Sequence, residues 1–128
     1  MTYGTLAIDT LNASTGVLAT QNGMTGIAKA WVNFDGTVTT PSTIRGQFNV
    51  TSVTKNGTGD YTVNFTTAMP NANYSTVIQV RFLSASVAFL SGNIYSDTTY
   101  TTSSVRFLVG QTNTVYDCAV VCVAVFSS

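Results

Sequence analysis

The sequence has no glutamate and no histidine, and charged residues of either sign are few. Five aspartates balance five lysines and arginines among 128 residues, so the formal net charge is zero. Without a broad field of one sign, we expect no binding to nucleic acid and no attraction to an anionic membrane. Without histidine, general base chemistry at neutral pH would fall to perturbed carboxylates or lysines.

Long apolar runs and targeting signals are also missing. No stretch reaches the roughly 18 apolar residues that a membrane-spanning helix requires. The opening "MTYGTLAIDT" lacks the basic start and apolar segment of a secretory signal. The sequence therefore predicts a soluble chain made in the cytoplasm, with no membrane insertion.

Cysteine is limited to Cys118 and Cys122. If "YDCAVVCVAVF" is one strand, both lie on one face about 13 Å apart, which is beyond disulfide reach. With no histidine or further cysteine to complete a coordination shell, we interpret them as small buried hydrophobic residues. An intersubunit disulfide or a metal site is the alternative interpretation.

The residues that are abundant, above all Thr and Val with Phe and Tyr, favour β-strands. Apolar and polar residues alternate over several segments separated by Gly, Pro, Asn and Asp, and the length suits one domain. The segments are 28–34, 44–51, 61–66, 75–83, 105–109 and 115–126. We predict an all-β, jelly-roll-like antiparallel β-sandwich of about 7–8 strands over residues 27–128, preceded by an extended N-terminal arm over residues 1–26.

Two segments carry the clearest strand signals. In "NGTGDYTVNF" the glycines favour a tight turn, after which Tyr61, Val63 and Phe65 point inward, so a hairpin sets the register. The segment 75–83 follows as a third meander strand. The last segment, 115–126, is apolar on both faces, so we expect it to be central or pressed against another subunit. The boundaries within 84–103 stay open.

The acidic residues do not form a catalytic pattern. Asp35 and Asp60 lie in turn sequences, where Asp bonds to the local backbone, and Asp117 flanks a strand and is a candidate partner for a basic residue. No hydrolase, phosphate-binding, calcium or zinc motif is present. We predict that the protein is not an enzyme and has no catalytic residues, no metal site and no cofactor.

Trp31 interrupts the pattern because it shares a face with Lys29 and Asn33. Either the N-terminal arm or a neighbouring chain covers this face, or the ring is a stacking platform for a sugar. The residues that we predict at an oligomer interface are Trp31, Cys118, Val120, Cys122 and Phe126. A second candidate is a surface recognition loop, for which plain turn structure is the alternative; its residues are Asn93, Tyr95, Asp97 and Tyr100.

The runs "AKAWVNFDGT" and "IRGQFNVTSVTKNGTGDYTVNFTTAMPNANY" resemble a module of tail-fibre-like and other virion proteins of tailed bacteriophages, especially those of marine and cyanobacterial hosts. The resemblance is dense from Ala28 to Tyr74, and the ending "VVCVAVFSS" looks like the last strand of that module. Residues 1–26 and 84–112 are less similar, and the link "DGTVTTPSTIRG" is longer than the Gly-rich link usual in the family.

The resemblance implies a non-enzymatic structural protein located in the virion, with β-rich subunits that commonly form homotrimers. The short chain favours a short fibre or fibre tip that contributes to host attachment, with residues 1–26 as docking arm. The alternatives are a capsid decoration protein that stabilises the shell and a free carbohydrate-binding module. The implied partners are further copies of the chain, other capsid or tail proteins, and a glycan or protein of the host surface.

Overall fold

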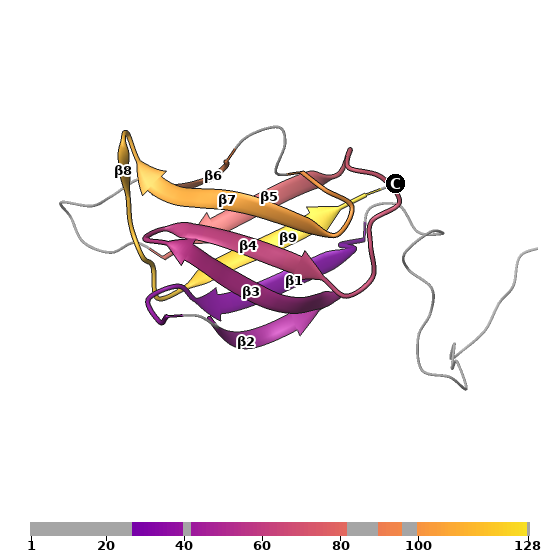
Figure 1. Ribbon diagram of the computed structural model, residues 1–128, viewed down its shortest axis with the longest axis horizontal. Helices are drawn as coiled ribbons and strands as arrows, with labels where there is room; N and C mark the ends of the chain where they lie inside the picture. The colour runs from indigo at the N-terminus through magenta and orange to yellow at the C-terminus, as the bar shows by residue number, and fades with distance from the viewer. Residues whose placement is uncertain (1–26, 40–41, 82–89, 96–99, 128) are drawn as a thin grey trace, which may run out of the picture.

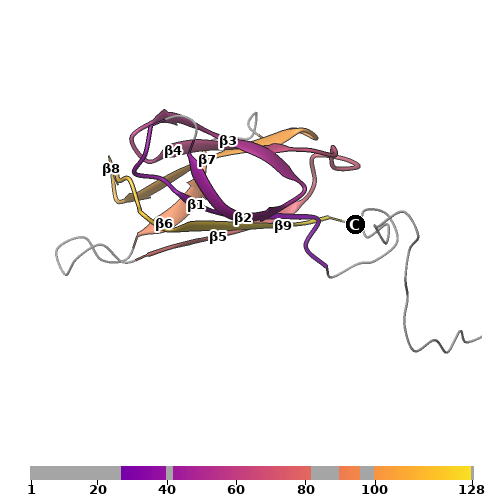
Figure 2. The same ribbon diagram turned by 90° about the horizontal axis from the view of Figure 1, so that it is seen from below.

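The fold is an antiparallel β-sandwich (Figures 1 and 2). The computed structural model describes residues 27–39, 42–81, 90–95 and 100–127, and these contain nine strands and no helix. The predicted fold class is therefore confirmed, with the short β6 and β8 raising the strand count above the expected number. The predicted arm at residues 1–26 lies outside the described residues.

Four strands form the first sheet, called sheet A here, in the order β2-β1-β9-β5. Their bounds are Ala30–Asp35 for β1, Thr43–Phe48 for β2, Ser75–Val80 for β5 and Val121–Phe126 for β9. Sheet B has the order β3-β4-β7-β6, with β8 paired to β7. Its strands are β3 (Val50–Gly57), β4 (Asp60–Phe65), β6 (Ser91–Ile94), β7 (Ser104–Gln111) and β8 (Thr114–Val115).

The core lies between the two sheets and follows the period of two in the sequence. Every second residue of the central strands is buried: Ala30, Val32 and Phe34 on β1, Val121, Val123 and Val125 on β9, Tyr61, Val63 and Phe65 on β4, and Val105, Phe107 and Val109 on β7. The ring of Tyr61 joins the sheets, with its centroid 5.2 Å from that of Phe34 and 5.8 Å from that of Phe107. The prediction that Tyr61, Val63 and Phe65 point inward is confirmed.

The hairpin between β3 and β4 has the register that the alternation predicts, with Val53 opposite Val63. Gly59 turns the chain with a φ of 62°, which glycine adopts without the steric cost that a Cβ atom brings. The register shifts between Val50 and Ser52, as at a β-bulge.

Asn49 is the corner at which the chain passes from sheet A to sheet B. Its φ is 53°, and Asn tolerates this left-handed conformation better than most residues. Its side chain donates to the carbonyl oxygens of Lys29 and Thr67 at 3.0 and 3.1 Å and accepts from the Thr67 amide at 2.7 Å. The prediction of one strand over 44–51 is therefore wrong, because β2 ends at Phe48 and β3 begins at Val50.

Two further expectations about strands are wrong. β5 does not continue a meander beside β4 but crosses to sheet A and pairs with β9. The last segment, 115–126, is interrupted at 116–120, so that β8 and β9 belong to different sheets. β9 itself lies between β1 and β5, which confirms the central position expected from its two apolar faces.

Candidate interaction surface

The outer face of sheet A carries an apolar row that crosses all four strands. Trp31 on β1 pairs with Phe48 on β2 and with Ala124 on β9, and Ala124 pairs in turn with Val77 on β5. Directly opposed residues of antiparallel strands point to the same face. The row therefore runs Phe48, Trp31, Ala124, Val77 from one edge of the sheet to the other.

Small side chains of β9 form the floor of a shallow groove along this face, called the apolar groove here. Cys122 and Ala124 lie between Trp31 and Asn33 of β1 and Val77 and Gln79 of β5, and the groove has a volume of about 350 Å³. Two large apolar side chains of the groove are strongly exposed, Trp31 at 43% and Val77 at 54%. Exposed apolar surface gathered in one place is typical of a binding surface.

Gly46 on β2 makes room for the tryptophan. A Cβ atom at this position would lie 3.3 Å from Cζ3 of Trp31, so a larger residue would push the indole away from the β2 backbone. Gly46 pairs with Asn33 of β1, and the register of the two strands shifts between Asn33 and Phe34. The position of the indole thus depends on local features of both strands.

Charge is confined to the edge of this face. Arg45 of β2 bonds to the Asp35 carboxylate at 2.8 Å and to the carbonyl oxygen of Ala119 at 2.6 Å. Hydrogen bonds from Thr37 in the following turn, and then the Arg45 charge, lower the pKa of Asp35. No residue that lines the apolar groove is charged, so its recognition chemistry is apolar with two amide groups.

The predicted oligomer-interface residues do not all belong to this face. Trp31 and Cys122 line the groove, and Phe126 lies on the same face of β9, opposite Ser75. Val120 is partly buried ahead of β9, where its carbonyl oxygen accepts a bond from the Arg81 amide. Cys118 is wrong as an interface residue, because it is fully buried in the core. The sequence analysis missed Phe48 and Val77.

The cysteines also differ from the expectation that they share one face. Both are free thiols. Cys118 belongs to the core and lies outside β9, whereas Cys122 is on the strand and faces the groove. Burial raises the pKa of the Cys118 thiol. The reactivity of Cys118 therefore depends on the core, and that of Cys122 on the apolar groove.

An acid, a base and a phenol meet where the chain enters β9. Asp117 accepts bonds from Lys55 Nζ at 2.7 Å, from the Gly59 amide at 2.8 Å and from the Tyr61 hydroxyl at 2.9 Å. Lys55 also donates to the carbonyl oxygen of Gly36. The expectation that Asp117 pairs with a basic residue is thus confirmed.

This cluster ties the two sheets together, because Asp117 leads into β9 of sheet A, whereas Lys55 and Tyr61 belong to β3 and β4 of sheet B. Burial opposes the charged form of Asp117, but its hydrogen bonds outweigh this, and its pKa is lowered. Burial, followed by the nearby Asp117 carboxylate, raises the pKa of Tyr61, whose side chain is fully buried. The same bonds explain why strand structure is interrupted at 116–120.

The residues predicted for a recognition loop separate in the structure. Asn93 is exposed on β6 and Tyr95 directly after it, and both point to the outer face of sheet B. Tyr100 packs inward, with its ring centroid 4.9 Å from that of Tyr74, so its place in an exposed loop is a wrong prediction. Asp97 lies outside the described residues.

Comparison with protein-family models, with curated proteins and with solved structures found no match to this chain. In the part of the chain that the structure describes, no group of three or more His, Cys, Asp or Glu residues could hold a metal ion. The same part contains no helix of the length and apolar character needed to cross a membrane. Fold and site together define an antiparallel β-sandwich with one apolar outer face.

Proposed function

We propose that the protein is a non-enzymatic structural protein of a bacteriophage virion, exposed on the particle as a short fibre or fibre tip and contributing to host attachment. The proposal rests on the resemblance of residues 28–74 to phage virion modules. The structural observation that carries it is the apolar groove, because a face of this kind is expected to be covered in the working assembly.

The proposed occupant of the groove is a second copy of the same chain. The groove has no charge to pair with a charged partner, and a net charge of zero means that copies do not repel one another. Burying a large apolar side chain contributes about 1.5–3 kcal/mol, so Trp31 and Val77 on each copy are strong anchors for association.

The edge of sheet A favours the same partner. Among the described residues, β5 pairs with β9 alone, and its sequence "STVIQV" has no charge and no proline. Such an edge strand is open to contact with another chain. A trimer closed by rotation would cover groove and edge on every subunit, and several copies at one tip would hold a host surface through weak, repeated contacts.

The test is to locate the chain in purified particles of the phage that encodes it, by antibody labelling in electron microscopy and by counting copies with quantitative mass spectrometry. We expect labelling at the tail, with a copy number that is a small multiple of three. A stoichiometry matching the capsid shell would favour the decoration protein instead. Absence from purified particles would contradict both.

A further inference from the structure

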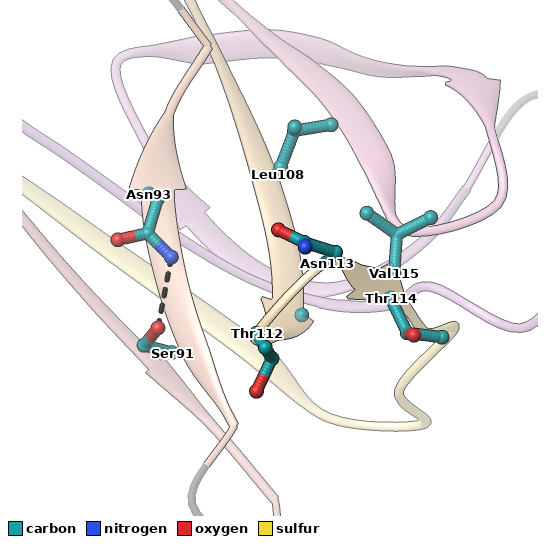
Figure 3. Close-up of a pocket in the computed structure, with 8 residues that line it drawn as sticks. Ser91, Asn93, Leu108, Thr112, Asn113, Thr114 and Val115 are labelled. Atoms are coloured by element: carbon teal, nitrogen blue, oxygen red, sulfur yellow. Dashed lines mark hydrogen bonds between the residues drawn. The ribbon is translucent and has the colours of Figure 1, made fainter.

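A second hollow lies on the outer face of sheet B, on the opposite side of the sandwich from the apolar groove. It is formed where β6, β7 and β8 lie side by side, and its volume is about 470 Å³ (Figure 3). This volume is within the range of pockets for small molecules. Leu108 of β7 lies in the middle, with Asn93 of β6 on one side and the β7–β8 hairpin on the other (Figure 3).

The polar groups around this hollow have unused hydrogen-bonding capacity. Asn93 donates one amide bond to the Ser91 hydroxyl at 2.8 Å, and its carbonyl oxygen bonds to no other described residue. The side chains of Thr112, Asn113 and Thr114 have no hydrogen-bond partner among the described residues. Amides and hydroxyls both donate and accept, so the hollow offers several groups of both kinds to a ligand.

Elsewhere on the outer face of sheet B, the polar side chains bond to one another. Asn64 of β4 donates to the hydroxyls of Ser52 and Thr54 at 3.0 and 3.2 Å. Asn56 donates to Asp60 and to Thr62 at 3.1 and 2.9 Å. On the β3–β4 half, polar side chains therefore satisfy one another, and the unused groups concentrate at the β6–β8 end.

The hollow is neutral and has an apolar floor. None of the residues that line it is charged, and Leu108 and Val115 are among them. Gly110 also lines the hollow. A side chain does not fit at this position, since a Cβ atom there would lie 2.5 Å from the carbonyl oxygen of Thr114. Thr112 adopts a φ of 55° where the hairpin turns, and strain of this kind in a β-branched residue is concentrated at functional sites.

An exposed aromatic ring stands next to the hollow in a fixed position. Tyr95 is 49% exposed and follows Asn93 by two residues on the same face. The guanidinium of Arg106 stacks on its ring at 4.1 Å from the centroid, a favourable cation–π geometry. Two bonds from Arg106 to Asp60, at 2.9 and 2.6 Å, hold the guanidinium and neutralise its charge.

We infer that the hollow bounded by Asn93, Leu108 and Asn113, with Tyr95 beside it, is a binding site for a neutral saccharide. Sugar hydroxyls match the unused amide and hydroxyl groups, and the C–H faces of a pyranose ring match Leu108, Val115 and the tyrosine. With no cation in the hollow, sialylated, sulfated or phosphorylated sugars have no charged partner. The inference rests on the proposed attachment function and names the class of receptor that it would use.

The experiment applies the full chain to an array of neutral and of acidic glycans, followed by titration of the ¹⁵N-labelled chain with the neutral glycans that bind best. We expect binding to neutral glycans with shifts at Ser91, Asn93, Leu108 and Asn113. The double variant Asn93→Ala and Asn113→Ala should bind at least about tenfold more weakly, because two hydrogen-bonding groups are removed. Tyr95→Ala should weaken binding to a smaller extent.

Two matched controls keep the test specific. Thr51→Ala, at an exposed position of β3 in the same sheet, should leave binding unchanged, and the melting temperature of each variant shows that it folds. The rival platform in the apolar groove is tested in the same titration of the unmodified chain, in which the indole signal of Trp31 should not shift. Shifts at Trp31 in place of Asn93 and Asn113, full binding by the double variant, or no neutral glycan bound at millimolar concentration would each overturn the inference. Presence in virions is measured separately, so an inactive hollow would leave the proposed function standing.

Discussion

The two outer faces of the sandwich differ in polarity. On sheet B, polar side chains are bonded to one another in a ladder that includes Asn64, Asn56 and the Arg106–Asp60 pair. On sheet A, the corresponding positions hold the row from Phe48 through Trp31 and Ala124 to Val77. In the strands of both sheets every second residue points into the core. The residues between them form the two outer faces.

The two faces differ in whether they need a partner to cover them. The face of sheet B needs no partner for its β3–β4 half, since the hydrogen-bonding groups there are satisfied within the sheet. The face of sheet A leaves tryptophan and valine in contact with water, which is unfavourable by roughly 25 cal/mol for each Å² of apolar surface. A partner is therefore expected on sheet A, and the predictions below test this difference.

The largest effect is expected from a charge placed in the apolar groove. Trp31→Asp or Val77→Asp should weaken association of the chain at least about 100-fold, because a buried unpaired carboxylate costs several kcal/mol. Mass by multi-angle light scattering over a dilution series gives the result. The matched control is Thr51→Asp at an exposed position of sheet B, for which the mass should not change. Equal association of all three variants would remove the distinction between the faces.

The two cysteines provide a second test of the same distinction. In the assembled wild type, Cys122 should be protected by the neighbouring copy, so Trp31→Asp should raise its rate of maleimide labelling by about tenfold or more. Cys118 should stay unreactive in both proteins until they unfold, because it is buried and its pKa is raised. Peptide mass spectrometry distinguishes the two sites. Equal labelling of Cys122 in both proteins would mean that the groove is open in solution.

A smaller effect is expected for the ion pair on sheet B. Hydrogen bonding to Arg106 lowers the pKa of Asp60, so the carboxylate stabilises the fold fully above its unfolded pKa of about 3.9. This contribution is lost as the pH falls through the lower folded pKa. Asp60→Asn should reduce the free energy of unfolding by about 1–2 kcal/mol at neutral pH.

Urea denaturation at several pH values measures this loss, in the Trp31→Asp background so that assembly does not contribute to stability. The difference in stability between the proteins with and without the Asp60→Asn substitution should vanish in acid, where the side chain at this position is uncharged in both. A difference that stays constant from neutral to acidic pH would show that the charge of Asp60 is not its cause.

The smallest effect is expected from the ladder itself. Asn64→Ala should lower the free energy of unfolding by only about 0.5–1 kcal/mol, because its partners Ser52 and Thr54 can bond to water once the amide is gone. The mass of the assembly should stay the same. A change of assembly mass in Asn64→Ala would show that the polar face also takes part in association.

The sequence predicted the fold class and the central strands because period-two alternation is a local signal. Trp31 and Cys122 were placed at an interface on the same ground. Phe48 was missed because the left-handed backbone of Asn49 and the register shift in β1–β2 change which residues share a face. Neither feature is visible in the alternation.

Long-range contacts account for the other errors. The apolar run that contains Cys118 reads as one strand, but Asp117 leaves the strand to bond with Lys55 and Tyr61, about 60 positions earlier in the chain. The pairing of β5 with β9 is also a contact between segments that lie far apart in the chain. Local pattern alone does not choose between such partners.

The central claim is that the apolar groove is covered by another copy of this chain, and the mass of the unmodified protein in solution tests it most directly. Sedimentation equilibrium over a dilution series should show an assembly that is a small multiple of the 13.5 kDa chain, with about three copies as the expected number. A protein of 13.5 kDa at every concentration would contradict the account.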